Sequence, residues 1–230
     1  MQNEVMDLDQ LAAYLHRDVR EVSKLANRGN LPGKKVGGEW RFASYDINYW
    51  LETQMHAFTE VELAAIERRG GTEPLLGSML SEATVAVPLL ASTKASVLKE
   101  LVNLAEQSWQ IYDTGALLSA IKQREELGTT ALESGIAIPH PQQPLSDKAQ
   151  GEAVVAFART TRGIPFGAPD GGLTDLFFLV CCRDARTHLR VLARLSRLML
   201  RPGFLDELRQ TESVSDTLQR IESAERELME

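Results

Sequence analysis

The sequence predicts two domains of different fold class: a small, mainly α domain, and a larger α/β layered domain with a mixed sheet flanked by helices. The chain has 230 residues, enough for one large or two smaller domains. Short amphipathic helices and one hairpin account for the first part, whereas helical and apolar extended segments alternate in the rest, as in layered α/β proteins. A stretch rich in Gly, Pro and charge separates the two parts. We expect a first domain over residues 1–56, a linker with a short helix over 57–74 and a second domain over 75–230.

Two helices are expected at the start of the chain. Apolar residues at helical spacing predict an amphipathic helix over residues 7–15. Asp18 and Glu21 form a capping-box pattern, which predicts a second helix from Val19 to about Arg28. The inner stripe of this second helix is expected to consist of Val19, Val22 and Leu25.

A hairpin and a third helix are expected next. Two short extended segments flank Gly37-Gly38, and glycine supplies the positive φ that a tight hairpin turn needs. A further helix is expected to begin at Ser44 or Asp46. Helix, turn, helix, hairpin and helix is the layout of a winged helix-turn-helix domain.

Positive charge concentrates in this region. Residues 17–41 hold seven basic and three acidic side chains, a local net charge of +4 in a chain whose formal net charge is −7. A basic patch in an acidic protein indicates a nucleic-acid surface. The alternative is a solvated charged face on a protein-binding module.

Four motifs of this region occur together in one family of DNA-binding domains. They are Leu8-x-x-Leu11-Ala12-x-Tyr14-Leu15, Arg28-Gly29-x-Leu31-Pro32-Gly33, Val36-Gly37-Gly38-x-Trp40-Arg41-Phe42 and Asp46-Ile47-x-x-Trp50-Leu51. Through them, residues 4–54 closely resemble the excisionase/MerR-type helix-turn-helix domains. The resemblance implies binding to double-stranded DNA, and a homodimer where the target is an operator. It places Arg20, Lys24 and Arg28 on the recognition helix and Lys34, Lys35 and Arg41 on the wing.

The second domain is expected to alternate helices and strands. Before it, Thr59 and Glu62 form another capping-box pattern, which predicts the short linker helix. Apolar periodicity then predicts strands over 85–87, 153–158 and 176–182, and helices over 94–106, 114–124, 187–200, 204–208 and 214–221.

One histidine follows a buried apolar run. Residues 136–138 are apolar and partly β-branched, which predicts a short buried strand or turn. Pro139 ends it because proline cannot donate to a sheet ladder, and Pro141 stiffens the chain beyond His140. An imidazole presented in this way is a candidate nucleophile or ligand, the alternative being a solvated loop histidine.

Other polar residues suit a phosphate near this histidine. Thr129 and Thr130 follow a glycine, and hydroxyls and glycine amides are common phosphate donors. Arg124 ends a predicted helix, where it either clamps a phosphoryl oxygen or stabilises the helix dipole. Thr187 and His188 begin another helix, whose first amides favour an anion, although His188 is alternatively a capping or surface histidine.

The order of these motifs is that of one family. Along the chain come Arg124-Glu125-x-x-Gly128, Gly135-Ile136-Ala137-Ile138-Pro139-His140, the segment 175–182 and Thr187-His188-Leu189-x-x-Leu192-x-x-Leu195. Residues 75–228 therefore resemble the IIA component of the bacterial phosphoenolpyruvate-dependent sugar phosphotransferase system, of the fructose/mannitol/nitrogen-regulatory type. The resemblance implies that His140 accepts a phosphoryl group from phosphohistidine on the carrier protein HPr. It makes His188 the second active-site histidine and Arg124 the arginine of the site, and it requires no metal or organic cofactor.

The sequence departs from the family pattern on both sides of the apolar run. Pro141-Gln142-Gln143-Pro144 stands where glycine and a basic residue are frequent, and Glu133-Ser134 stands where Gly-Asn is usual. Two hypotheses follow. In the first, a DNA-binding regulator carries a phosphotransfer domain, and the state of His140 controls promoter occupancy. In the second, a non-catalytic regulator uses its IIA-like domain to bind a protein or ligand.

Composition narrows the remaining classes. Apolar residues make up 43% of the chain and charged residues 25%, as in globular proteins. No apolar run reaches about 18 residues and the first residues are acidic, so neither a membrane segment nor a signal region is expected. The two cysteines, Cys181 and Cys182, are adjacent and point to opposite faces of a strand, so no disulfide is expected between them. These features fit a cytoplasmic protein.

Overall fold

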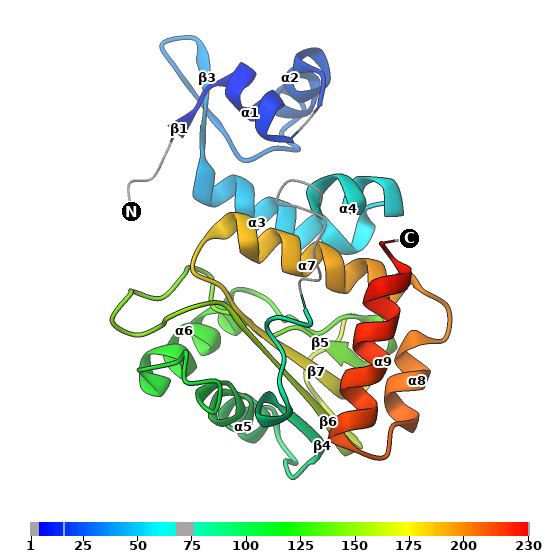
Figure 1. The fold of residues 1–230 in the computed structure, drawn as a ribbon. Coiled ribbons are helices and arrows are strands. Elements are labelled where there is room, and N and C mark those ends of the chain that lie inside the picture. Colours follow the sequence, from blue (N-terminus) through cyan, green and yellow to red (C-terminus); the bar gives the residue numbers. More distant parts are fainter. Residues whose placement is uncertain (1–4, 16, 68–75, 230) are drawn as a thin grey trace. The chain divides into compact units, whose positions relative to one another are not determined.

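The computed structural model describes residues 5–15, 17–67 and 76–229 (Figure 1). The chain divides into two compact units, Met1–Phe58 and Thr59–Glu230. The first is mainly helical and the second is an α/β unit with a mixed sheet, which confirms the predicted fold class. No helix within the described residues is long and apolar enough to cross a membrane. The Gly- and Pro-rich stretch predicted over residues 68–74 lies outside the described residues.

The first unit combines helices with a small antiparallel sheet. Its elements are β1 (Val5–Met6), α1 (Leu8–Leu15), α2 (Val19–Asn27), β2 (Lys34–Val36), β3 (Glu39–Ala43), α3 (Ser44–Gln54) and the 3₁₀ turn η1 (Met55–Ala57). Strand β3 pairs with β1 on one side and with β2 on the other. Gly37 and Gly38 both have positive φ and make the turn of the β2–β3 hairpin, as predicted.

The start of α2 agrees with the sequence, but its inner face does not. The carboxylate of Asp18 accepts a hydrogen bond from the backbone N–H of Arg20 (2.8 Å) and caps the helix. Val19 is 38% exposed, so its assignment to the inner stripe is wrong. The buried stripe runs instead through Val22 and Ala26, four residues apart and therefore on one face.

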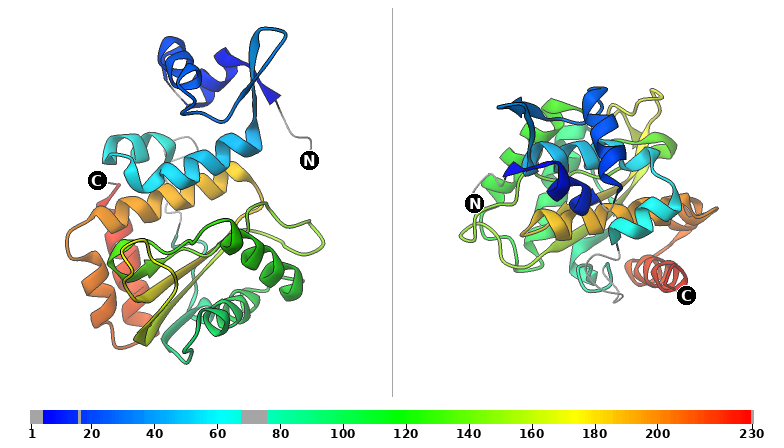
Figure 2. Two further views of the ribbon diagram at one scale, coloured as in Figure 1. Left: turned by 180° about the vertical axis from the view of Figure 1, so that it is seen from behind. Right: turned by 90° about the horizontal axis from the view of Figure 1, so that it is seen from above.

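The second unit is a mixed sheet between two layers of helices. Its elements are α4 (Glu60–Glu67), η3 (Glu82–Thr84), β4 (Val85–Leu89), α5 (Lys94–Glu106), α6 (Thr114–Leu127), η4 (Glu133–Gly135), β5 (Ile136–Ala137), β6 (Val154–Ile164), β7 (Thr174–Cys181), α7 (Ala185–Leu200), α8 (Phe204–Gln210) and α9 (Val214–Glu227). The strand order is β4-β6-β7-β5, with β6 and β7 antiparallel and the two outer pairs parallel. Helices α5 and α6 cover one face of the sheet, and α7, α8 and α9 cover the other (Figures 1 and 2).

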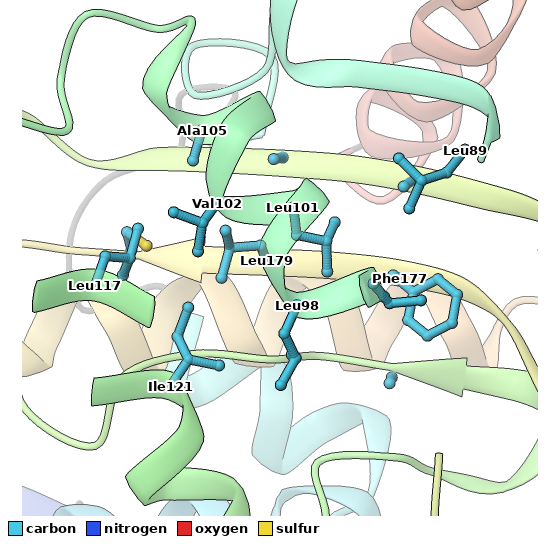
Figure 3. Close-up of a cluster of buried hydrophobic side chains, with 14 of the residues drawn as sticks. Leu89, Leu98, Leu101, Val102, Ala105, Leu117, Ile121, Phe177 and Leu179 are labelled. Carbon is cyan, nitrogen blue, oxygen red and sulfur yellow. The ribbon is translucent and has the colours of Figure 1, made fainter. Parts of the chain in front are cut away.

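One core layer lies between the sheet and helices α5 and α6. Alternate residues of β6 and β7 point into it because successive strand residues face opposite sides. Burying one such side chain contributes about 1.5–3 kcal/mol, so the layer fixes the sheet firmly against these helices. Figure 3 shows Leu98, Leu101 and Val102 of α5 and Leu117 and Ile121 of α6 beside Phe177 and Leu179 of β7.

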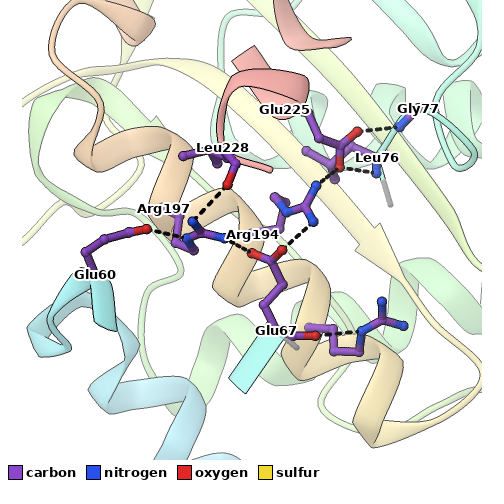
Figure 4. A network of polar contacts seen from close by, with 9 residues as sticks. Glu60, Glu67, Leu76, Gly77, Arg194, Arg197, Glu225 and Leu228 are labelled. Carbon is purple, nitrogen blue, oxygen red and sulfur yellow. Dashed lines mark hydrogen bonds and ion pairs between the residues drawn. The ribbon is translucent and has the colours of Figure 1, made fainter. Parts of the chain in front are cut away.

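A buried network of ion pairs holds α4 on α7 (Figure 4). Arg194 of α7 is fully buried and donates to the carboxylate of Glu67. Arg197, one turn further along α7, donates to Glu67 (2.8 Å) and to Glu60 (2.6 Å). Burial alone raises the pKa of Glu67, but hydrogen bonds and charge from the two arginines outweigh it and hold the pKa below its ordinary value.

The same network reaches the last helix and the segment after residue 75. Glu225 of α9 accepts from the second branch of the Arg194 guanidinium. Its carboxylate also accepts from the backbone N–H groups of Leu76 (2.9 Å) and Gly77 (3.1 Å). The helix that the sequence predicts in the linker is thus packed into the second unit through buried charge.

The adjacent cysteines are both buried and unbonded, which confirms that no disulfide joins them. Burial raises the pKa of Cys182 to about 12 and the pKa of Cys181 well above its ordinary value. The thiolate is the reactive form of cysteine, so neither side chain suits nucleophilic chemistry at neutral pH.

Candidate functional site

His140 lies just beyond β5, in a segment that stays paired with the sheet. Ile136 pairs with Leu176 of β7 in parallel register. The contact continues past the end of the strand, where the backbone N–H of Val180 donates to the carbonyl of Pro139 (3.0 Å). Pro139 has no N–H to donate to the sheet, but its carbonyl still accepts a hydrogen bond and holds the chain one residue before His140.

A hairpin supports the same segment on its other side. The backbone N–H of Leu132 donates to the carbonyl of Ile136 (2.8 Å), and the N–H of Ile138 donates to the carbonyl of Thr130 (3.0 Å). These bonds pair residues 130–132 antiparallel to 136–138.

The imidazole of His140 is held in one tautomer. Its Nδ1 lies 2.6 Å from the carbonyl oxygen of Ile138. Since a carbonyl only accepts, Nδ1 carries the hydrogen, and in the neutral ring the lone pair is on Nε2. The side chain is buried. A neutral imidazole whose lone pair is on Nε2 is a competent nucleophile.

Helix α7 brings the second histidine to the first. The ring centroids of His188 and His140 are 4.9 Å apart, with their planes at 54°. His188 stands in the first turn of α7, which Asp184 caps by accepting from the backbone N–H and the hydroxyl of Thr187, both at 2.8 Å. Thr187 directly precedes His188, and Asp184 occupies its N–H and hydroxyl in this conformation, so phosphate contact by Thr187 stays a prediction.

Arg124 is buried at the end of α6 and faces the same hairpin. Its Nη1 donates to the carbonyl of Gly128 (2.9 Å). Gly128 lies two residues before Thr130, so this hydrogen bond ties the guanidinium to the chain that enters the hairpin. The two histidines are thus in contact, and Arg124 is joined through one backbone group to the hairpin that carries His140.

The two predicted phosphate-binding threonines shape the loop beside His140. The hydroxyl of Thr130 donates to Glu125, whose carboxylate also pairs with Lys94 of α5 (2.7 Å). The hydroxyl of Thr129 contacts the carbonyl of Phe166 (3.4 Å) and accepts from the N–H of the next residue but one. Phosphate contact by Thr129 and Thr130 stays a prediction, because both hydroxyls are engaged within the protein.

Sequence reasoning missed Glu125 and Lys94. Glu125 had a local signal, since it follows Arg124 and a carboxylate at a helix end needs a cation or donors to be buried. Lys94 had none, because it begins a helix more than thirty residues earlier and meets Glu125 only in the folded chain.

The two basic residues of α2 and the arginine at its C-cap face solvent. Arg20, Lys24 and Arg28 are exposed, and within the described chain none of the three forms an ion pair. Their charges are therefore available to an anionic partner. Asp18 caps the first turn of α2, so the helix is regular from its start and holds Arg20 and Lys24 in a fixed arrangement.

The basic residues of the wing differ from one another. Lys34 and Lys35 are exposed on β2, and the Nζ of Lys35 lies 5.1 Å from the centre of the Trp40 ring. Arg41 donates to the carboxylate of Glu39 (2.7 Å) and is half-buried. Of the predicted wing contacts, Arg41 is therefore partly neutralised, whereas Lys34 and Lys35 keep their charge at the surface.

Together, the helix-turn-helix layout of the first unit and the mixed α/β fold of the second define the class of protein: a helix-turn-helix unit followed by a IIA-type unit. Comparison with known families agrees. The family described as "Phosphoenolpyruvate-dependent sugar phosphotransferase system, EIIA 2" matches residues 78–224, and the one described as "Helix-turn-helix domain" matches residues 5–55. The chain belongs to the EIIA 2 family and carries an additional helix-turn-helix domain, which confirms both resemblances drawn from the motifs.

Individual relatives support the same assignment. The nitrogen regulatory protein of Bradyrhizobium diazoefficiens is 37% identical over 124 residues, which is 53% of this chain and 77% of that protein. The fructose-specific EIIABC component of Bacillus subtilis is 28% identical over 137 residues, 59% of this chain, and the match spans only 21% of that longer protein. The crystal structure of nitrogen regulatory protein IIA-Ntr from Neisseria meningitidis is 26% identical, with a TM-score of 0.58 over 64% of this chain and 99% of that one.

Proposed function

We propose that this protein is a DNA-binding regulator whose IIA-type unit accepts a phosphoryl group on His140 from phosphohistidine of HPr. Its phosphorylation state then controls the occupancy of DNA by the helix-turn-helix unit. The observation that carries the proposal is the 2.6 Å hydrogen bond between Nδ1 of His140 and the Ile138 carbonyl, which leaves Nε2 as the nucleophile. Membership of the EIIA 2 family and the names of its relatives support the same chemistry.

The proposed transfer needs positioning and charge more than acid–base chemistry. Nε2 of His140 attacks the phosphorus, the N–P bond of the donor imidazole breaks, and the donor ring recovers its lone pair. The ring of His140 keeps its Nδ1 hydrogen and gains positive charge as the new N–P bond forms, and the Ile138 carbonyl stabilises that charge. Arg124 and an N–H of His188 donate hydrogen bonds to the phosphoryl oxygens and stabilise their negative charge.

The DNA half of the proposal rests on exposed charge. Arg20 and Lys24 on α2, Arg28 at its C-cap, and Lys34 and Lys35 on the wing supply contacts to the phosphate backbone. A single helix-turn-helix unit covers one half-site, so we propose that a homodimer binds an operator. The proposed location is the cytoplasm.

A labelling experiment tests the phosphotransfer. The full-length protein is incubated with enzyme I, HPr and labelled phosphoenolpyruvate, and the label should be stable in alkali and lost in acid, as for an N–P bond. DNA affinity of the labelled and unlabelled forms is then compared. Phosphorylation adds about −1.5 to −2 charges, and we expect an affinity change of roughly fivefold or more. A folded protein that takes up no label supports the second hypothesis, a non-catalytic binding module.

Removing two charges from α2 should weaken DNA binding and its salt dependence. In the double variant Lys24→Ala with Arg28→Ala, the slope of log affinity against log salt should fall in magnitude by up to about 2, since each phosphate contact releases about one counterion. Fluorescence anisotropy with duplex DNA at several salt concentrations measures it. Lys99→Ala with Lys148→Ala removes two exposed lysines of the second unit and is the matched control. Equal slopes for the two double variants would exclude α2 from the DNA interface.

A further inference from the structure

The turn η4 joins the two arms of the hairpin that builds the candidate site. Residues 130–132 form one arm and follow Gly128, whose carbonyl accepts from Arg124; residues 136–138 form the other arm and lead into His140. The register between the arms therefore fixes the position of the segment that carries His140. A slip of one residue would turn every side chain of an arm to the opposite face.

This turn has an unusual backbone. Ser134 has φ of 65° and Gly135 has φ of 80°. The left-handed region suits glycine, but it is uncommon for serine. The turn therefore needs support from outside its own sequence.

Arg209 of α8 supplies that support. Its Nη2 donates to the carbonyl of Ser134 (2.5 Å). The same guanidinium donates through Nε and Nη2 to the two oxygens of Asp175, each at 2.9 Å. Asp175 lies on β7, one residue before the position that pairs with Ile136. One side chain thus ties the turn to the strand against which β5 aligns.

Gly135 packs closely against the Arg209–Asp175 ion pair, and the helix that carries Arg209 is itself held in place. A Cβ added to Gly135 would lie 2.8 Å from Nη2 of Arg209 and 2.9 Å from Oδ1 of Asp175, so a larger residue there would displace this ion pair. The end of α8 is held in turn by Arg159 of β6, which donates to the carbonyl of Thr211 (2.7 Å). Arg209 therefore reaches the turn from a fixed position.

We propose that Arg209 is a positioning residue for phosphoryl transfer, holding the turn Glu133–Gly135 and with it the register of the hairpin arm that leads into His140. The inference rests on the proposed function, because it assigns Arg209 a role in that reaction. Arg209 touches no reacting atom and acts through the backbone of the turn.

Three variants of the full-length protein test the role. Arg209→Ala should lower the rate of labelling at saturating phospho-HPr by about tenfold or more, because small misplacements of reacting groups are costly. Adding Ser134→Gly to it should restore part of the rate, since glycine adopts the left-handed turn without help. Arg220→Ala, which removes an exposed arginine paired with Asp216 on α9, is the charge-matched control and should label at the wild-type rate.

The outcomes separate a positioning role from a general structural one. A rate that Ser134→Gly restores in the Arg209→Ala background supports the proposal. A wild-type rate in Arg209→Ala, a loss confined to KM, or a loss that Ser134→Gly leaves unchanged overturns it.

A spectroscopic measurement keeps the inference independent of phosphotransfer. If the wild-type protein takes up no label, the proposed function fails, and the ¹⁵N and ¹H NMR signals of the His140 ring then decide the role of Arg209. A shift of these signals in Arg209→Ala, reversed by Ser134→Gly, supports positioning. Ring signals identical to those of the wild type in Arg209→Ala overturn it.

Discussion

Replacing His140 with alanine is expected to abolish phosphoryl labelling, a loss of at least about 10³-fold, because alanine provides no atom that forms an N–P bond. The measurement is the rate of label uptake from phospho-HPr, with far-UV circular dichroism to show that the variant is folded. His16→Ala with His56→Ala removes the two other histidines outside the pair and is the residue-matched control. This control should be labelled at the wild-type rate.

The neighbours of His140 should give graded losses. His188→Ala removes one donor to the transferred group and is expected to slow labelling by about 10²–10³-fold. Arg124→Lys keeps the charge but loses the planar fork that binds Gly128, so the rate should also fall. Full labelling of His140→Ala would refute the assignment of the acceptor. Labelling of the control double variant, with none of His140→Ala, would confirm it.

Replacing Arg194 with methionine is expected to destabilise the second unit by about 3–5 kcal/mol, which corresponds to a fall in Tm of roughly 6–20 °C. The substitution leaves the buried carboxylates of Glu67 and Glu225 without their shared cation. Urea unfolding followed by circular dichroism and differential scanning calorimetry measure the change. Arg220→Ala, an exposed ion pair on α9, should cost at most about 0.5 kcal/mol. Equal effects of the two substitutions would contradict a stabilising role for the buried network.

The same network predicts a pH dependence. Because the pKa of Glu67 is lower in the folded state, its stabilisation is present above the unfolded-state pKa and is lost as the pH falls through the folded-state value. Glu67→Gln should therefore flatten the loss of stability on acidification while lowering stability at neutral pH.

Local sequence signals located most elements of the fold. Helix α5 has the bounds that apolar spacing predicted, Lys94–Glu106, and α4 opens with the reciprocal contacts of Thr59 and Glu62. Strand β1 was missed because two residues, Val5–Met6, are too few for a periodic pattern. Val19 was assigned to the wrong face because an apolar residue in the first turn of a helix is compatible with more than one apolar stripe. Local patterns therefore predict the existence and type of a secondary-structure element better than they predict which of its side chains are buried.

The candidate site was predictable only in part. His140, His188 and Arg124 came from motifs in the right order, and the structure places the two histidine rings in contact. The supporting groups were not predictable, because Arg209 meets Ser134 across 75 residues of chain. Arg194 was not predictable either, because its partners lie on separate helices.

The packing of α4 bears on how such a protein is assembled from parts. Residues 60–67 lie outside the stretch 78–224 that matches the EIIA 2 family, yet two arginines of α7 depend on them. Helix α4, although it lies between the two matched domains in the sequence, thus packs as part of the IIA-type unit. A chimera that exchanges the DNA-binding unit should be joined before Thr59, because a junction after Glu67 would carry the donor's helix onto a surface built for this one.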